Sequence, residues 1–329
     1  MTRKIAVIGS NSFSGSDFID LIAEDKSFQV IGISRSEEKS KLFLPYKRHE
    51  NRKYKFFQLD LNKDMKDILK LLDNFAPDYI INFAGLVEVA TSWLYPDQWF
   101  ITHTLSTVRL CHYLAGVKYL KRYIHISTPE VYGSCDGINE DAPLNPSTPY
   151  AVSKAAADLY IQTLVKHYSF PAILVRSTNV YGAHQQLYRI IPKTIVSLKL
   201  NKKIKLHGGG IAKKSFIHIR DISKGELLAL ERGKIGQIYH FSPDQAIEVR
   251  RVVAMICTKM GKDFKKVTRN VAERLGQDAI YAIDSTKARK TLGWKPKITL
   301  ADGIDNVTDW INYNWQEIKK LPLEYIHKA

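Results

Sequence analysis

Ile5-Ala6-Val7-Ile8-Gly9-Ser10-Asn11-Ser12-Phe13-Ser14-Gly15 is the stretch that decides the fold of this 329-residue chain. Its first four residues form a short apolar run, which is typical of a buried parallel strand. A turn with glycines follows, and Phe18, Ile19 and Ile22 then recur with helical spacing. Strand, glycine turn and helix in this order indicate a dinucleotide site, because the turn lets the backbone approach a pyrophosphate and the helix N-terminus supplies amide donors.

The turn and the ends of two later strands supply most of the expected cofactor contacts. Serine stands at position 12, where a middle glycine is usual, so the glycine motif alone is weak evidence. A strand at Phe56–Leu61 places its last residues at the adenine, and the small residues that end the strand Tyr79–Gly85 let the backbone pass close to a cofactor. The expected contacts are Gly9, Ser12, Phe13, Gly15, Asp60, Leu61 and Ala84.

The strand Gln29–Ile33 bears on the choice between NAD and NADP, because it ends at Ser34 and Arg35. An acidic residue at this point would bind the ribose hydroxyls of NAD, and there is none here. Arg35 is suited to pair with the 2′-phosphate of NADP, which favours NADP slightly. The alternative is an ordinary surface arginine in a loop.

Strands alternate with helical patterns over residues 1–180, which predicts an α/β fold with a Rossmann-type, doubly wound parallel sheet. Ligands of such sheets bind at the carboxyl ends of the strands. Because Gly9, Asn82, Thr128 and Glu130 all follow predicted strands, we expect them to lie in one cleft.

The second half of the chain has shorter elements and more loops. We expect residues 181–329 to form mainly a smaller α/β lobe for the substrate, with returns of the chain to the cofactor-binding unit near 215–240. Asp221 is the expected N-cap of a helix in that return.

Pro149-Tyr150-Ala151-Val152-Ser153-Lys154 opens an alanine-rich helix, on which Tyr150 and Lys154 stand on one face, one turn apart. Tyrosine has a pKa of about 10, and a nearby lysine ammonium favours the phenolate and lowers that pKa. Such a phenolate takes a proton from a sugar hydroxyl while the carbon below gives up hydride to a nicotinamide. The spacing alone also fits an ordinary amphipathic helix.

Composition limits the other classes of function. The net charge of +16 raises nucleic-acid binding, but the Lys and Arg residues are scattered, and an anionic small substrate is the alternative that we favour. Cys111, Cys135 and Cys257 show no metal-ligand spacing and cannot all pair, which suits a reducing cytoplasm. No apolar run approaches the length of a bilayer span. We therefore expect a cytoplasmic protein with no metal, no nucleic-acid partner and no membrane segment.

Five motifs in order resemble those of the extended short-chain dehydrogenases/reductases, over essentially the whole chain. Within that superfamily the chain is similar to the NAD-dependent epimerase/dehydratase family that acts on nucleotide sugars, and most similar to dTDP-glucose and GDP-mannose 4,6-dehydratases. The resemblance implies a lyase that uses an NAD(P) cofactor on a nucleotide-diphosphate sugar. The motifs are the glycine turn, Asn82-Phe83-Ala84, Ser127–Gly133, Tyr150-xxx-Lys154 and Leu292–Pro296.

The resemblance also implies a reaction cycle. Tyr150, aided by Lys154 and Thr128, takes the C4 hydroxyl proton, the C4 ketone acidifies C5, water leaves from C6, and hydride returns there. The family's Thr-Asp-Glu is Thr128-Pro129-Glu130 here, so one acid is missing. Either Glu130 makes both proton transfers, as in GDP-mannose dehydratases, or no water is eliminated. C4 epimerisation, C4 oxidation, a UDP-glucuronate decarboxylase-like reaction and a non-catalytic dinucleotide-binding regulator are the alternatives.

The resemblance extends to the substrate and to the assembly. Residues 85–92 depart from the polar run of dTDP-glucose dehydratases, which makes dTDP-glucose doubtful as the substrate. Helices at 97–116 and 150–168 match those that form a four-helix bundle in homodimers of the family. The implied substrate-binding residues are Ser92, Asn179, Arg189, Lys214 and Arg274.

Overall fold

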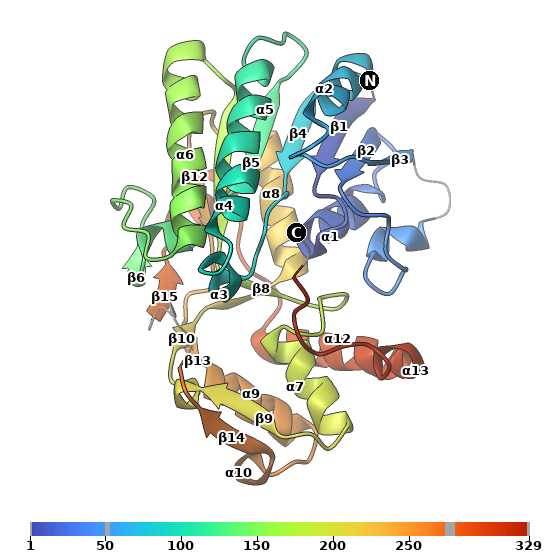
Figure 1. Ribbon diagram of the computed structural model, residues 1–329, viewed down its shortest axis with the longest axis vertical. Helices are drawn as coiled ribbons and strands as arrows, with labels where there is room; N and C mark the ends of the chain where they lie inside the picture. The colour runs from blue at the N-terminus through green and yellow to red at the C-terminus, as the bar shows by residue number, and fades with distance from the viewer. Residues whose placement is uncertain (1, 50–52, 274–279, 328–329) are drawn as a thin grey trace.

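The computed structural model describes residues 2–49, 53–273 and 280–327. Its centre is a seven-stranded sheet in which every neighbouring pair is parallel, as the alternation of apolar runs and helical patterns predicts (Figure 1). In sheet order the strands are β12 (Ile238–Phe241), β7 (Ala172–Ser177), β5 (Arg122–Ile126), β4 (Tyr79–Asn82), β1 (Arg3–Ile8), β2 (Phe28–Ser34) and β3 (Tyr54–Gln58).

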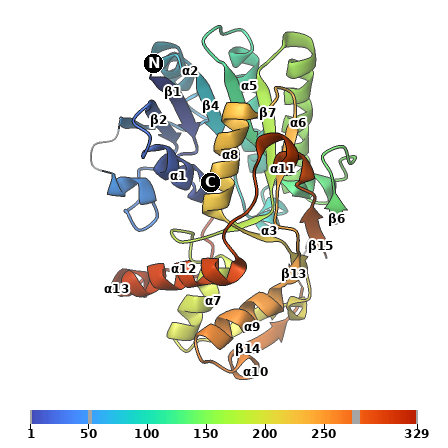
Figure 2. The same cartoon turned by 180° about the vertical axis from the view of Figure 1, so that it is seen from behind.

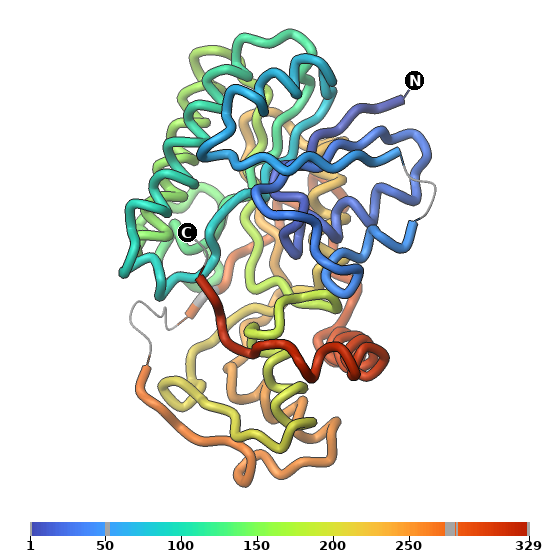
Figure 3. The backbone as a smooth tube through the Cα atoms, turned by 45° about the vertical axis from the view of Figure 1, so that its right-hand side comes forward, coloured from blue at the N-terminus to red at the C-terminus, as the bar shows by residue number. Residues whose placement is uncertain are grey.

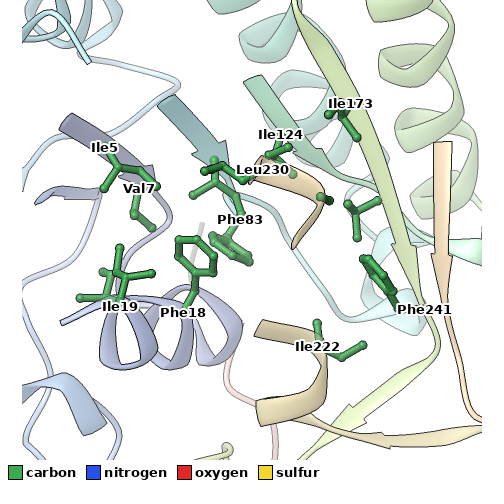
Figure 4. Close-up of a cluster of buried hydrophobic side chains, with 14 of the residues drawn as sticks. Ile5, Val7, Phe18, Ile19, Phe83, Ile124, Ile173, Ile222, Leu230 and Phe241 are labelled. Atoms are coloured by element: carbon green, nitrogen blue, oxygen red, sulfur yellow. The ribbon is translucent and has the colours of Figure 1, made fainter. Parts of the chain in front are cut away.

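Alternate residues of the buried strands face opposite layers of helices, because side chains along a strand point to opposite faces of its sheet. On β1, Ile5 and Val7 pack against one layer, whereas Ala6 and Ile8 pack against the other. Figure 4 shows the first of these cores, where Phe18 and Leu230 lie close to the strand residues. The first layer holds α1 (Phe13–Ile22), α8 (Ile219–Arg232) and α11 (Thr286–Leu292) and faces the viewer in Figure 2; the second holds α2 (Met65–Phe75), α5 (Ser106–Leu114) and α6 (Pro149–Tyr168).

The lobe below the sheet has its own core. Three helices, α7 (Ile190–Lys199), α9 (Val249–Lys259) and α12 (Leu300–Tyr313), bury apolar side chains such as Ile195, Val252 and Val307. The remaining strands are β6 (Cys135–Ile138), β8 (Asn179–Tyr181), β9 (Ile204–His207), β10 (Lys213–Lys214), β11 (Phe216–His218), β13 (Ile247–Glu248), β14 (Thr268–Val271) and β15 (Ile280–Ile283).

Two strands cross the boundary expected at residue 180. β12, from the second half of the chain, forms an edge of the large sheet, and β6, from the first half, pairs with β15 beside the lobe. The fold class predicted from the sequence is confirmed by this architecture. The assignment of 1–180 and 181–329 to cofactor and substrate stays a prediction.

One expected helix cap is wrong. The N-cap of α8 is His218, not Asp221, which lies within the first turn of the helix. The Asp221 carboxylate instead accepts backbone N–H bonds of 2.9 Å from Lys297 and Ile298. A helix-capping residue and a carboxylate that anchors a distant loop look alike in sequence, because both are acidic residues near a helix start.

The C-terminal segment returns from the lobe to the helices beside the sheet (Figure 3). It leaves α13 (Trp315–Ile318) and ends against the short helix α4 (Pro96–Trp99), where His327 stacks on Tyr95 and Trp99 at ring-centroid distances of 5.2 and 5.5 Å. On the way, Tyr325 packs edge-on against Tyr188 at 5.2 Å. The segment therefore ties the lobe to the helices beside the large sheet.

None of the helices in the described ranges is long and apolar enough to cross a bilayer. Cys111, Cys135 and Cys257 are all buried, and no disulfide joins any of them to another described residue. Within the same ranges, no group of three or more His, Cys, Asp or Glu side chains is arranged to hold a metal ion.

Glu226 on α8 makes the stability of the fold depend on pH. Its side chain is 1% exposed, and its Oε2 has no hydrogen-bond partner among the described residues. Burial, with the charge of Asp17 as a smaller cause, raises the pKa of Glu226 well above its usual range. Above that usual range the unfolded chain ionises while the folded chain keeps the proton, so the free energy of unfolding falls as pH rises.

We expect Glu226→Gln to be more stable than the parent at about pH 8, by at least about 1 kcal/mol, because the amide needs no proton to stay neutral. The difference should shrink towards about pH 5 in urea unfolding. Glu24→Gln is the matched control on the surface, where its side chain is 63% exposed, and should change little at either pH. A Glu226→Gln variant with a constant deficit across this range would contradict the assignment.

Candidate active site

The glycine turn at the start of α1 is shaped by two close approaches. Gly9 has φ of +82°, and a Cβ placed there would lie 2.6 Å from the backbone nitrogen of Ala84, at the exit of β4. A Cβ on Gly15 would lie 2.5 Å from the Gly9 carbonyl oxygen. Both positions therefore require glycine, and the turn and the β4 exit lie directly against each other.

Ser12 is the N-cap of α1, and its hydroxyl accepts a 3.0 Å bond from the backbone N–H of Gly15. This role explains why a serine serves at position 12, where a glycine is usual. The amides of Phe13 and Ser14 begin the helix and so have no carbonyl partner within it. Such amides and the positive end of the helix dipole suit a pyrophosphate, so the turn fits a dinucleotide.

Ser34, the last residue of β2, contacts the glycine turn. The Ser34 hydroxyl accepts a 3.0 Å bond from the backbone N–H of Asn11, so Ser34 braces the glycine turn, while Arg35 next to it is exposed. β3 ends at Gln58, three residues earlier than the sequence pattern indicated. Asp60 and Leu61 therefore lie in the following turn, where the Asp60 carboxylate accepts from the backbone N–H of Asn62.

The four predicted catalytic residues lie at the carboxyl end of the sheet and at the start of α6. Thr128 follows β5 and caps the short helix η3 (Pro129–Tyr132), with its hydroxyl accepting a 3.2 Å bond from the Glu130 backbone N–H. Tyr150 lies in the first turn of α6. Its phenol is hydrogen-bonded to Thr128 and lies in the field of the Glu130 carboxylate.

The charge state expected for the tyrosine is wrong for the protein by itself. The pKa of Tyr150 is raised, mainly by burial and then by the negative charge of Glu130, whereas the hydrogen bond with Thr128 and the charge of Arg189 oppose the rise. Lys154 is not among the groups that oppose the rise. Its ammonium donates a 2.6 Å bond to the backbone carbonyl of Ile126. Burial also lowers the pKa of Lys154 to about 8.

A buried ionic group that the sequence pattern did not reveal fixes α6 to the sheet. Asp158, one turn after Lys154, accepts 2.7 Å from the Arg176 guanidinium and 2.6 Å from the Ser127 hydroxyl. Arg176 also bonds the Tyr132 phenol, whose oxygen lies 2.8 Å from His240 Nε2. The signal in the sequence was an acidic residue on the buried face of a helix that carries the catalytic pair.

The predicted substrate residues fall into two groups. Ser92, on the short helix α3 (Val89–Ser92), accepts a 3.2 Å bond from the Tyr150 backbone N–H, and Arg189 is close enough to Tyr150 to influence its pKa. Asn179 lies further towards the lobe, where its backbone N–H bonds the carbonyl of Ser215, next to Lys214. Arg274 lies outside the described residues.

The side-chain amide of Asn179 has a donor that the described residues leave unsatisfied. Its side-chain nitrogen Nδ2 is buried and has no hydrogen-bond acceptor within the described ranges. A buried amide without a partner costs free energy, so its presence needs an explanation.

The sequence matches proteins of one enzyme family over most of its length. A family model described as GDP-mannose 4,6 dehydratase matches residues 7–307. The dTDP-D-glucose 4,6-dehydratase of Mus musculus is 29% identical over 97% of this chain and 92% of its own length. The dTDP-glucose 4,6-dehydratase of Haemophilus influenzae is 27% identical over 94% of this chain and 98% of its own length.

The structure matches solved members of the same group. A dTDP-glucose 4,6-dehydratase from Streptomyces venezuelae with NAD bound superposes with a TM-score of 0.87 at 28% identity, covering 96% of this chain and 100% of that one. A UDP-glucuronic acid 4-epimerase from Bacillus cereus, in complex with its sugar nucleotide and NAD, has a TM-score of 0.86 at 25% identity, covering 94% and 99%. The chain therefore belongs to the GDP-mannose 4,6-dehydratase family, within the extended short-chain dehydrogenases/reductases.

Proposed function

We propose that the protein is a nucleotide-sugar 4,6-dehydratase, which oxidises C4 of the sugar, eliminates water across C5 and C6, and returns hydride to C6. The observation that supports this reaction most directly is the grouping of Thr128, Glu130 and Tyr150. It combines a phenol for the C4 hydroxyl with a carboxylate beside it. A simple C4 epimerase has no need of that carboxylate, and it is the second candidate because such an enzyme has a similar structure.

Tyr150 is the group that exchanges a proton with the C4 hydroxyl, and Thr128 orients its phenol by the hydrogen bond between them. When bound, a nicotinamide dinucleotide accepts hydride from C4 and returns it at C6, and the positive charge of its oxidised ring favours the Tyr150 phenolate. The Arg189 guanidinium acts in the same direction. Lys154, fixed by the Ile126 carbonyl, presents a positive charge from the base of the site.

Glu130 is the group proposed to handle both protons of the elimination. Its carboxylate takes the proton from C5, which the C4 ketone has made acidic, and gives it to the departing C6 hydroxyl, so that water leaves. Pro129, the neighbour at which the family's aspartate would stand, has no titratable group. The proton that leaves C5 is thus the one that completes the water. When hydride returns to C6, C5 takes up a proton, and this proton is balanced by the one that Tyr150 removed from the C4 hydroxyl.

We propose NAD as the cofactor. The slight preference for NADP rested on Arg35 and on the lack of an acidic residue beside it, and no comparison supports it. Solved dTDP-glucose 4,6-dehydratases from Streptomyces venezuelae and from Bacillus anthracis contain NAD. The turn of Gly9, Ser12, Phe13 and Gly15 would hold the pyrophosphate, with Ala84 at the opposite wall.

The substrate is proposed to be a nucleoside diphosphate sugar. Arg189, Lys214 and Arg274 would bring positive charge to a diphosphate of charge near −2, and charge-assisted hydrogen bonds of this kind are strong. The partnerless Nδ2 of Asn179 would gain an acceptor there, and Ser92 lies beside Tyr150. The identity of the base and of the sugar is left to experiment, with the cytoplasm as the expected compartment.

Mass spectrometry of the denatured protein, before and after incubation with GDP-, UDP-, CDP- and dTDP-sugars, tests the reaction and the cofactor together. We expect NAD to be released from the protein and one sugar nucleotide to become lighter by one water. Glu130→Gln should lower the rate of water loss about 100-fold or more, while reduced nicotinamide accumulates, because oxidation at C4 does not need Glu130.

Asp141→Asn is the matched control, because Asp141 is an exposed carboxylate in the loop before α6 and should leave the rate unchanged. Water loss at the parental rate in Glu130→Gln would contradict the assigned role. If the wild-type product has the same mass as the substrate, the protein is an epimerase and not a dehydratase.

We further propose that the protein is a homodimer through the helical layer of α5 and α6. The π-helical turn η2 (Phe100–Leu105) leads into α5, and both segments pack against α6. Exposed apolar side chains occur on both ranges expected to form a four-helix bundle, and exposed apolar surface is typical of a protein interface where it is extensive. They are Phe100, Ile101, Leu105, Tyr113, Val152 and Leu159.

Leu159→Arg should convert the dimer to a monomer, because a buried unpaired charge at the interface costs several kcal/mol. Light scattering coupled to gel filtration measures the mass in solution. Ile211→Arg places the same charge on an exposed aliphatic residue of the lobe and should leave the dimer intact. A wild-type monomer, or a dimer that survives Leu159→Arg, would contradict this interface.

A further inference from the structure

His103 lies in the π-helical turn η2, and its side chain is 2% exposed. π-Helical turns are rare and often occur at functional sites, because they widen the helix and re-aim a side chain. Here the widened turn directs the imidazole into the space between the exit of β4 and the start of α6, where it meets partners from both.

The hydrogen bonds of His103 form one directed chain. The backbone N–H of Leu86 donates to Nε2 at 2.9 Å, so this ring nitrogen bears the lone pair and Nδ1 bears the proton. Nδ1 lies 2.9 Å from the Ser153 hydroxyl oxygen, which in turn donates a 2.8 Å bond to the backbone carbonyl of Tyr150. Each donor thus has an acceptor, with a single tautomer.

The imidazole is held neutral as well as oriented. Burial, and after it the positive charge of Lys154, keep the pKa of His103 well below its usual range. A proton on Nε2 would also face the Leu86 N–H, which is a donor itself. The chain of bonds therefore does not change over the pH range in which most enzymes work.

Each end of the chain reaches a part of the proposed site. Leu86 follows the β4 exit, which lies against the glycine turn at Gly9. At the other end, Tyr150 is bonded through its carbonyl, and its ring meets the imidazole edge-on with centroids 5.5 Å apart. The imidazole of His103 bonds Leu86 and Ser153, not the Tyr150 phenol oxygen or the glycine turn, so it acts through the residues that it holds.

We propose that His103 is a positioning residue that fixes the β4 exit to the start of the catalytic helix, and so sets the Tyr150 phenol relative to the cofactor. This inference rests on the proposed function for the identity of the reacting groups. Both hydrogen bonds are needed, because the Leu86 bond places the loop at the cofactor and the Ser153 bond places the turn that bears Tyr150. A displacement of about 1 Å in such a site costs about 100-fold in rate.

Two amide substitutions separate the two bonds. The side-chain nitrogen of asparagine occupies the place of Nδ1, so His103→Asn keeps a donor for Ser153 and loses the acceptor for Leu86. The side-chain oxygen of glutamine reaches the place of Nε2, so His103→Gln keeps the acceptor for Leu86 and loses the donor for Ser153. His103→Leu removes both bonds and keeps an apolar side chain of similar bulk.

The first readout is the affinity for NADH, measured by its fluorescence on titration into each variant. We expect His103→Asn and His103→Leu to weaken binding about 10-fold and His103→Gln to match the parent. The second readout is kcat on the sugar nucleotide that the wild type converts, with its pH profile. We expect His103→Gln to lower kcat about 100-fold and to shift the limb set by Tyr150, and His103→Asn to lower kcat less.

The proposal is wrong if all variants lose the same stability but keep the NADH affinity, kcat and pH profile of the parent. His103 would then have only a packing role. If the His103 variants do not fold, Ser153→Ala breaks the same chain at its second link and should reproduce the kcat loss with unchanged NADH affinity. If the wild type converts no sugar nucleotide, the proposed function fails. The contrast in NADH affinity between Asn and Gln at position 103 then decides the positioning role by itself.

Discussion

The buried ion pair between Asp158 and Arg176 is the interaction on which the site depends. The pair joins α6 to β7 with a 2.7 Å bond, and the Ser127 hydroxyl bonds the same carboxylate oxygen from the end of β5. Two strands and the helix are thus fixed at one point, at the carboxyl edge of the sheet. Removing either charge would leave the other buried and unpaired, which costs more than the pair contributes.

That fixed point determines the electrostatics of the proposed catalytic group. Lys154 lies one turn before Asp158, whose charge partly opposes the fall of the lysine pKa caused by burial. Tyr150 lies one turn earlier still, where burial and Glu130 raise its pKa. The start of α6 therefore carries a neutral Tyr150 phenol one turn before the charged Lys154. The positive charges of the protein do not suffice to lower the pKa of Tyr150. The phenolate therefore forms only when a further positive charge binds beside the phenol.

Sequence reasoning could predict what depends on local pattern. The strands around Ile5–Ile8 and Tyr79–Asn82 are apolar runs bounded by small residues, so their place in a parallel sheet follows from composition and spacing. The sequence also predicts that Thr128 and Glu130 lie at the site, because the carboxyl ends of parallel strands lie along one edge of the sheet. It assigned Asp221 to the wrong role and gave His103 none, since their partners are more than fifteen residues away in sequence.

Pro129 affects both the backbone of the site and its chemistry, because proline fixes φ and has no titratable side chain. Proline suits the first turn of the helix η3, because its fixed φ fits a helix start and its missing N–H has no partner there in any case. The substitution thus costs the fold little, and it keeps Glu130 in a short, rigid turn after β5. The chemistry is left with one carboxyl group between C5 and the C6 hydroxyl. A single carboxylate that takes the C5 proton and gives it to the leaving hydroxyl returns to its starting state, so the elimination step balances without the missing aspartate.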